Sequence, residues 1–345
     1  GVGTITTNTD GIVVAGIVTA NNFSGDVTGN VTGNLSGGTI NATSGTVTGN
    51  LGVGGVLTYE DVTNIDSVDG SSLTGVTPSF IAEGGVETTY ESGGTKYMLH
   101  TFLNTGVFRT NNAKTIDFLL VGGGGASPAA QLSYGSSGGG GGGGVVEGTN
   151  FSLSAGTYVV TVGAGGVRTG EYTRGGNGGD TTFAGVTAKG GGGGGDYAAT
   201  GADGGSGGGG GEVTQAGGAT IQSSQNSGIS NIQQFGFAGG TGGQYQSSPN
   251  GSGGGGGAGG AGGAPDSTSH SNAVGGAAGN GRANSITGTS TTYGRGGIGG
   301  GHGQMYADPG LNGRGDGATG ATASHPHQGK GANGGSGIVI IRYTI

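Results

Sequence analysis

Hydrophobic residues of this chain are concentrated in a few short segments in which apolar and polar side chains alternate. Residues 97–102, 106–110 and 115–121 follow such patterns, and residues 338–341 form one further apolar run. A period of two residues is typical of β-strands. We therefore predict an all-β protein with essentially no α-helix, with a small β-domain over residues 80–121 and a closing β-strand over residues 338–345.

The first part of the chain carries a short repeat. Units that combine glycine, asparagine or aspartate, one aliphatic residue and threonine or serine recur over residues 25–36, with an echo at 48–51. The Gly-Asn pairs suit tight turns with positive φ. A single chain of this kind leaves its strand edges unpaired, whereas three chains wound together close them. We predict a homotrimeric β-repeat shaft over residues 1–58 and a connector over 59–79; the alternative is a flexible linker.

Long glycine runs dominate the region between the apolar segments. Pure runs cover residues 138–144, 190–195, 207–211 and 253–257, and small residues with a period of three cover 258–264. Three residues per turn is the geometry of extended polyproline-type helices, and chains without side chains can approach closely enough for backbone hydrogen bonds, supplemented by Cα–H···O contacts. We predict that residues 122–337 form a sandwich of polyglycine-II helices, called rods below, with pure glycine runs inside and mixed runs outside.

The loops that join the rods should alternate between two ends. If each glycine-rich run crosses the sandwich once and the two terminal strands mark the base, the loops at the opposite, outer end are 126–137, 167–174, 196–203, 244–252, 282–293 and 321–328. By the same count, the loops at the base are 145–162, 180–189, 212–238, 264–274 and 304–312.

Composition excludes several classes of protein. With 98 glycines among 345 residues, 30% hydrophobic and 9% charged residues, the chain cannot build an ordinary globular core, so standard enzyme folds are excluded. The net charge of -8 is spread along the chain, which argues against nucleic acid as a partner. The absence of cysteine excludes disulfides and thiolate metal sites. No apolar run has the length of a membrane span and no secretion leader opens the sequence, so we expect no membrane insertion. We also predict no cofactor.

The predicted outer loops contain aromatic, basic and histidine side chains. Aromatic faces with hydrogen-bonding rims suit sugars or the external loops of a membrane protein. The alternative is that the tyrosines only shield the rod ends. The candidate receptor-binding residues are Tyr134, Arg168, Tyr172, Arg174, Tyr197, Tyr245, Arg282, Tyr293, His325 and His327.

Other motifs carry less weight. The many GxGxxG matches lack a strand-helix unit and a downstream acid, so they do not indicate a nucleotide site. Residues 175–180 begin like a calcium-binding nonapeptide, but Thr182 stands where a large apolar residue belongs. The pair His325 and His327 is more typical of an exposed loop than of a metal site, and residues 314–316 (Arg-Gly-Asp) indicate a rod edge. We therefore predict no metal site and no catalytic residue.

Three segments resemble known families. The repeats and residues 59–68 (YEDVTNIDSV) are similar to segments of structural proteins of marine cyanobacterial tailed phages. Residues 100–125 and 334–343 together resemble a glycine-rich domain of phage fibres and bacterial surface proteins, a closed module whose first and last strands meet. The glycine runs resemble the polyglycine-sandwich adhesins of some T-even-like phages, in which loops at the distal end bind the receptor.

These resemblances imply an extracellular tail-fibre adhesin of a virion. Its expected partners are two further copies of itself, a host surface glycan or outer-membrane protein, and other fibre or baseplate proteins. The alternatives are a purely structural fibre or whisker and a non-viral extracellular or ice-binding protein. A depolymerase working between subunits is the weakest alternative, because no Ser-His-Asp order or carboxylate pair is recognisable.

Overall fold

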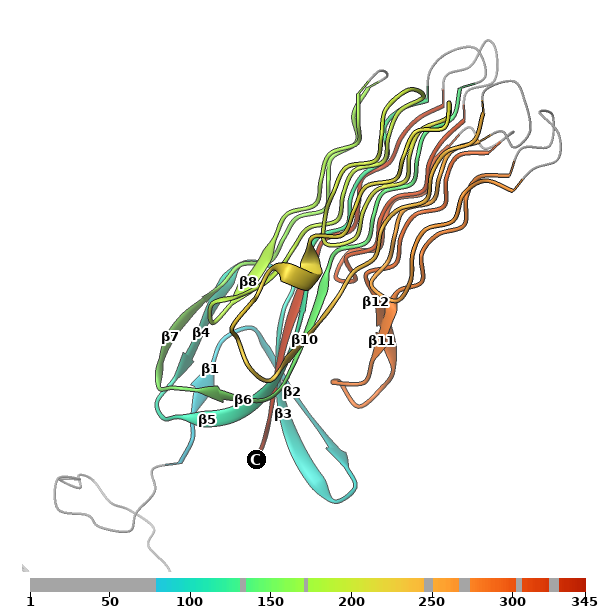
Figure 1. Cartoon of the computed structure of the whole chain (residues 1–345). Helices are drawn as coiled ribbons and strands as arrows, with labels where there is room; N and C mark the ends of the chain where they lie inside the picture. Colours follow the sequence, from blue (N-terminus) through green and yellow to red (C-terminus); the bar gives the residue numbers. More distant parts are fainter. Residues whose placement is uncertain are drawn as a thin grey trace, which may run out of the picture. The chain divides into compact units, whose positions relative to one another are not determined.

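The computed structural model describes residues 79–130, 135–170, 173–244, 251–266, 274–301, 306–322 and 329–345. The predicted shaft over residues 1–58 and nearly all of the connector lie outside these ranges. Figure 1 shows β-strands at one end of the described part and wavy, extended segments running away from them. The all-β prediction is confirmed, and the one helical element of the described residues is the short 3-10 turn η2 (Gln222–Ser224).

An antiparallel sheet of six strands lies at the base of the glycine-rich segments. Its order is β10-β6-β5-β13-β3-β2. The strands are β2 (Val86–Ser92), β3 (Thr95–Phe102), β5 (Lys114–Val121), β6 (Val145–Leu153), β10 (Ile232–Phe235) and β13 (Ile338–Thr344). Ile338 pairs with Val121, so the closing strand meets the strand that leads into the glycine region, as the resemblance implied. The small β-domain is thus completed by strands from beyond residue 121.

Smaller sheets surround this main sheet. A three-stranded sheet has the order β1-β4-β7, and two hairpins are formed by β8 with β9 and by β11 with β12. The strands are β1 (Ala82–Glu83), β4 (Gly106–Thr110), β7 (Gly156–Val160), β8 (Thr181–Phe183), β9 (Val186–Ala188), β11 (Arg282–Asn284) and β12 (Thr291–Tyr293).

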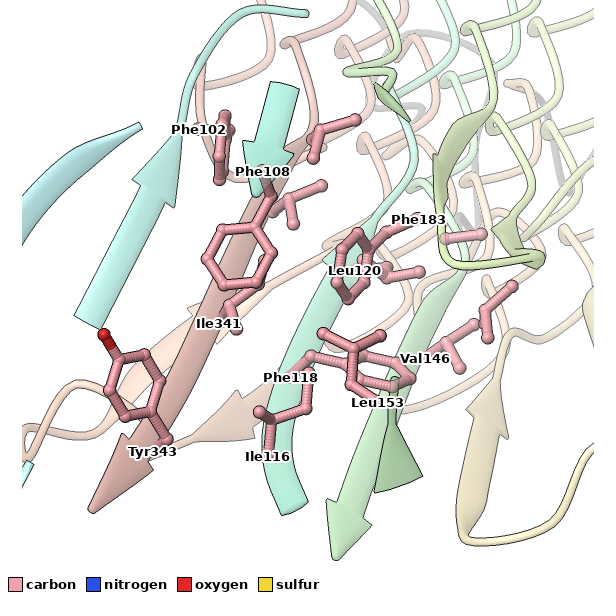
Figure 2. Packing of buried hydrophobic residues seen from close by; sticks show 14 residues of the cluster. Phe102, Phe108, Ile116, Phe118, Leu120, Val146, Leu153, Phe183, Ile341 and Tyr343 are labelled. Atoms are coloured by element: carbon pink, nitrogen blue, oxygen red, sulfur yellow. The ribbon is translucent and has the colours of Figure 1, made fainter. Parts of the chain in front are cut away.

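The apolar core lies at this base end and is rich in phenylalanine. Figure 2 shows Phe108, Phe118 and Phe183 gathered within one cluster. The rings of Phe108 and Phe118 meet Phe183 edge-on, with centroids 5.9 and 6.0 Å from its ring. Leu119 packs in a second cluster, so both faces of β5 are buried. Burial of each large apolar side chain contributes about 1.5–3 kcal/mol, so these residues hold the base together.

The glycine-rich segments are held by backbone hydrogen bonds that repeat every three residues. N–H groups 122 and 125 donate to the segment 141–144, groups 123 and 126 to the segment 176–179, and groups 124 and 127 to the segment 332–335. Successive N–H groups therefore point in three directions, which is the geometry of a helix with three residues per turn. The predicted polyglycine-II rods are present.

The pure run 138–144 lies inside the array. Its N–H groups donate to the segments 189–195, 253–256 and 315–318, while its carbonyl groups accept from the segments 122–125 and 206–209 and from Gly297. A Cβ atom on Gly140 would lie 2.1 Å from the carbonyl oxygen of Gly125. Glycine is therefore required on every face of an inner rod, and backbone hydrogen bonding replaces an apolar core there.

The number of crossings differs from the prediction. Residues 201–205 run toward the base beside 190–193, and 206–211 run outward again beside 139–142. Residues 215–218 form a further crossing within the predicted base loop 212–238. Two extra crossings leave the direction of the following rod unchanged, so the segment up to residue 244 ends at the outer end, as predicted.

A turn that was not predicted changes the positions of the later loops. Gly257 bridges Gly260 across a tight turn at the base, so the stretch 253–263 is two crossings and not one. The described ends of the predicted base loop 264–274 consequently lie at the outer end. The predicted outer loop 282–293 is instead the β11–β12 hairpin beside the main sheet (Figure 1). Residues 306–310 are also a crossing, which pairs with 330–333, and the turn after them lies at the base.

Candidate functional site

The outer end of the rods is where the chain reverses far from the main sheet. The segment 122–130 leaves β5 and the segment 135–144 returns to β6, and the later rods repeat this path (Figure 1). Side chains cannot project between inner rods, because a Cβ atom there meets backbone at about 2 Å. Within the rod array, side chains able to recognise a partner are therefore confined to the rod ends and to the outward faces of peripheral rods.

The structure places three of the ten predicted site residues at this outer end. They are Arg168, Arg174 and Tyr197, each in or beside a reversal of the chain. Five others, Tyr134, Tyr172, Tyr245, His325 and His327, lie outside the described residues.

Arg174 joins two neighbouring outer turns. Its Nη2 atom donates to Oγ1 of Thr200 over 2.7 Å, and its backbone carbonyl accepts from Thr169 Oγ1, also over 2.7 Å. Arg168 is exposed, and its backbone N–H donates to Asn333 Oδ1 over 2.8 Å. The exposed guanidinium groups can donate several hydrogen bonds to a carboxylate or to sugar oxygens.

Tyr197 lies in the turn next to Thr200. The N–H of Ala199 closes this turn by donating to the carbonyl of Asp196 over 2.8 Å, and the tyrosine is half-buried. Tyrosine combines an apolar ring with a polar hydroxyl, which makes it a common residue type at interfaces. Arg174, Tyr197 and Thr200 lie on two neighbouring outer turns and are together called the outer patch below.

Arg282 and Tyr293 do not belong to the outer end, which corrects the prediction. Arg282 lies on β11 and forms two hydrogen bonds with the Glu147 carboxylate, of 2.9 and 3.1 Å, which raise the pKa of the guanidinium further. Its guanidinium also stacks 4.0 Å from the ring centroid of Phe235. Tyr293 is 4% exposed and packs with Leu119, and burial raises the pKa of its phenol. Through these contacts both side chains stabilise the packing of the β11–β12 hairpin against the main sheet.

Glu212, which the sequence analysis did not single out, lies fully buried at the outer end. Its Oε2 atom accepts the Ser136 N–H over 3.0 Å, and the neighbouring hydroxyls of Ser136 and Ser252 are hydrogen bonded over 2.8 Å. Burial raises the pKa of this carboxyl to about 7, against a smaller opposing effect of the hydrogen bond from Ser136. The sequence does contain a signal for this residue. Glu212 directly follows the glycine run 207–211, and an acidic residue at that position must lie at the end of a rod.

The calcium-like segment has another role in the structure. Asn177 Oδ1 accepts the Gly193 N–H over 2.9 Å, and the Asp180 carboxylate binds the Lys189 ammonium over 2.6 Å and accepts the Gly190 N–H over 2.9 Å. These side chains therefore link residues 177–180 to residues 189–193 of the neighbouring rod. Within the described ranges, no group of three or more histidine, aspartate or glutamate side chains could hold a metal ion. No helix in the same ranges has the length and apolar character of a membrane span.

One comparison with known proteins agrees with the glycine-rich character of the chain. A family model described as a glycine-rich domain matches residues 101–344, from within β3 to the end of β13. No curated protein matches the sequence.

Proposed function

The chain belongs to the glycine-rich domain family, and from this premise we propose that it is a non-enzymatic fibre adhesin of a tailed phage, which binds a receptor on the host cell through the outer end of its rods. The proposal places the protein on the virion, outside the cell, as a homotrimer whose other partners are fibre or baseplate proteins. Its receptor would be a surface glycan or an outer-membrane protein.

One observation carries the proposal. The described ends of many rods lie side by side at the end remote from the main sheet, and the inner rods are fixed by backbone hydrogen bonds on all sides. A rigid scaffold of this kind holds the described residues at the rod ends in fixed relative positions, so little conformational freedom is lost there on binding. This arrangement supports recognition more directly than it supports a whisker, which has no need of varied loops.

The outer patch supports the same reading at the level of side chains. Arg174 and Tyr197 belong to the residue types that dominate binding energy at interfaces. Individual contacts at such a patch are weak, but three copies on one fibre would add avidity without any new contact.

The test is binding of the labelled full-length chain to candidate host cells. The double variant Arg174→Ala/Tyr197→Ala should bind at least about tenfold more weakly, since two interface anchors are removed. The control is Arg109→Ala, which removes an exposed arginine from β4 at the base and should leave binding unchanged. Truncation after Val121 is a poor test, because it removes β6, β10 and β13 from the main sheet.

Two outcomes would contradict the proposal. Equal cell binding by the double variant and the wild-type protein would remove the outer patch from the receptor site. Failure of the full-length chain to bind any host, together with capture of other virion proteins, would favour the purely structural fibre.

A further inference from the structure

A hollow lies on the flank of the rods, next to the β11–β12 hairpin and well away from the outer patch. It has a volume of about 610 Å³ and is lined by Asn280, Thr292, Arg295, Leu311, Arg314 and Asp316. A second hollow of about 240 Å³ shares Arg295, Leu311 and Asp316 with it. The two form one groove, called the flank groove below, of the size that a few sugar units or a short peptide would fill.

The polar groups of the flank groove are held in place by the fold. Asp316 Oδ1 accepts the backbone N–H of Arg295 over 3.0 Å. Arg314 lies on a turn between Gly313 and Gly315, whose φ angles of 69° and 65° favour glycine. Its Nη1 atom donates to the carbonyl of Thr292 over 3.3 Å, and its guanidinium lies 6.0 Å from the ring centroid of Tyr293.

Among the described residues, neither arginine of the groove forms an ion pair, although both act on Asp316 through their charge. The ion pairs formed by arginine or lysine in the described part of the chain join Arg282 to Glu147, Arg342 to Asp117 and Lys189 to Asp180. Arg295 and Arg314 are absent from these pairs, although the chain carries an excess of acidic residues. Unpaired guanidinium groups in a concave surface favour an anionic ligand, because their planar donors match a carboxylate.

The same groove also offers carboxylate oxygens. Asp316 lies within the influence of both arginines, yet burial raises its pKa to about 6. Asp308 lines the adjoining hollow. A ligand that carried only negative charge would be repelled by these two groups. A ligand that combines one carboxylate with several hydroxyl donors would satisfy both the arginines and the aspartates.

We infer that the flank groove binds an acidic saccharide, a chain containing uronic acid units. The uronate carboxylate lies against Arg295 and Arg314, and the ring hydroxyls lie against Asp316, Asn280 and Thr292. Leu311, which is 61% exposed, supplies an apolar surface for the C–H face of a sugar ring. This site deepens the proposed function, on which it rests, by giving a ligand class for a second surface of the same adhesin.

The experiment measures binding of a labelled oligogalacturonate to the full-length chain at low salt. Arg295→Gln and Arg314→Gln should each raise the dissociation constant about tenfold or more, because a charge-assisted hydrogen bond is lost. Arg295→Lys should bind more tightly than Arg295→Gln but more weakly than the wild-type protein, since lysine keeps the positive charge but lacks the paired donors of the guanidinium group. Arg109→Gln is the matched control on β4 and should bind as the wild-type protein does. Thermal melting of each variant separates lost binding from lost folding.

Several results would overturn the inference. These are unchanged affinity in both arginine variants, equal binding of a neutral oligogalactan, or no saturation at millimolar oligogalacturonate. Equal binding of a polyglutamate peptide would replace the saccharide with an acidic peptide.

The outer-patch double variant distinguishes this inference from the proposed function. It should keep oligogalacturonate binding even where it loses cell binding. If the wild-type chain binds oligogalacturonate through the arginines and binds no cell, the proposed function is wrong, but the assignment of the flank groove as a saccharide site is retained.

Discussion

At the scale of single residues, Glu212 is the clearest case of a side chain whose chemistry is set by its surroundings. A carboxyl group loses its hydration when it is buried, and the hydrogen bonds from Ser136 and Gly251 offset this loss only in part. The second carboxylate oxygen, Oε1, has no hydrogen-bond partner in the described part of the chain. The neutral form is therefore favoured in the folded protein.

This burial makes the stability of the protein depend on pH. The pKa of Glu212 is raised from 4.5 to about 7 in the folded state, so the unfolded chain releases its proton first. The contribution of Glu212 to the free energy of unfolding should fall by up to about 3–4 kcal/mol as pH rises from about 4.5 to 7, at about 1.4 kcal/mol per pH unit, and be level above that. Urea unfolding between pH 4 and 8 would measure it.

Glu212→Gln is the variant that isolates this effect. The amide keeps the shape of the neutral carboxyl but does not titrate, so the stability of the variant relative to the wild-type protein should rise across the same interval. Asp316, with a pKa of about 6, contributes equally to both proteins and cancels in the difference. A constant difference from pH 4 to 8 would show that Glu212 does not hold its proton in the fold.

At the scale of elements, the rods differ from strands in what they demand of the sequence. A strand requires a side-chain pattern, whereas an inner rod requires the absence of side chains. A Cβ atom on Gly140 would approach the Gly125 oxygen to 2.1 Å, but one on Gly260, at the peripheral turn, would find its nearest neighbour 3.7 Å away. The same substitution should therefore have opposite consequences at these two glycines.

Gly140→Ala should destabilise the protein by about 3 kcal/mol or more, since neighbouring backbone has to move to admit the methyl group. Gly260→Ala should be neutral or slightly stabilising, because alanine restricts the unfolded chain without a clash. Thermal unfolding of the two variants beside the wild-type protein provides the comparison. Similar melting temperatures for both variants would mean that the array is looser than its hydrogen bonds indicate.

The strands and the long rods were predictable because each has a local signal. The alternation in residues 97–102 and 115–121 gave β3 and β5, and the pure run 138–144 gave an inner rod. The crossings 201–205 and 215–218 were missed because they are short and contain non-glycine residues on their outward faces. The turn at 258–259 was missed because small residues on both sides read as one run.

These misses explain the errors in the candidate site. The unrecognised turn at 258–259 moves the next loops to the opposite end, until the unrecognised crossing 306–310 restores the count, so Arg282 and Tyr293 were assigned to the wrong end of the rods. The flank groove was not predicted at all, since it brings together residues from β12, three rods and a turn that are remote in the sequence. Only the pairing of rods in space reveals it.

At the scale of the whole described part, two kinds of stabilisation act at opposite ends. The base is held by burial of phenylalanine and aliphatic side chains around the main sheet. The rods beyond it are held by peptide hydrogen bonds, with little apolar surface to bury. The first is accompanied by a large heat capacity of unfolding and the second is not, because exposure of polar groups lowers the heat capacity.

The heat capacity of unfolding should therefore be unusually small for the length of the chain. Globular proteins show about 12–15 cal/mol/K per residue, and we expect the compact unit of residues 74–345 to fall clearly below this range. Scanning calorimetry at several pH values gives the quantity from the slope of unfolding enthalpy against midpoint temperature. A small value implies a flat stability curve, hence rods that keep their order over a wide range of temperature. A value of about 12–15 would instead mean that unfolding exposes as much apolar surface as in an ordinary domain, and that the rods are not held mainly by their backbone.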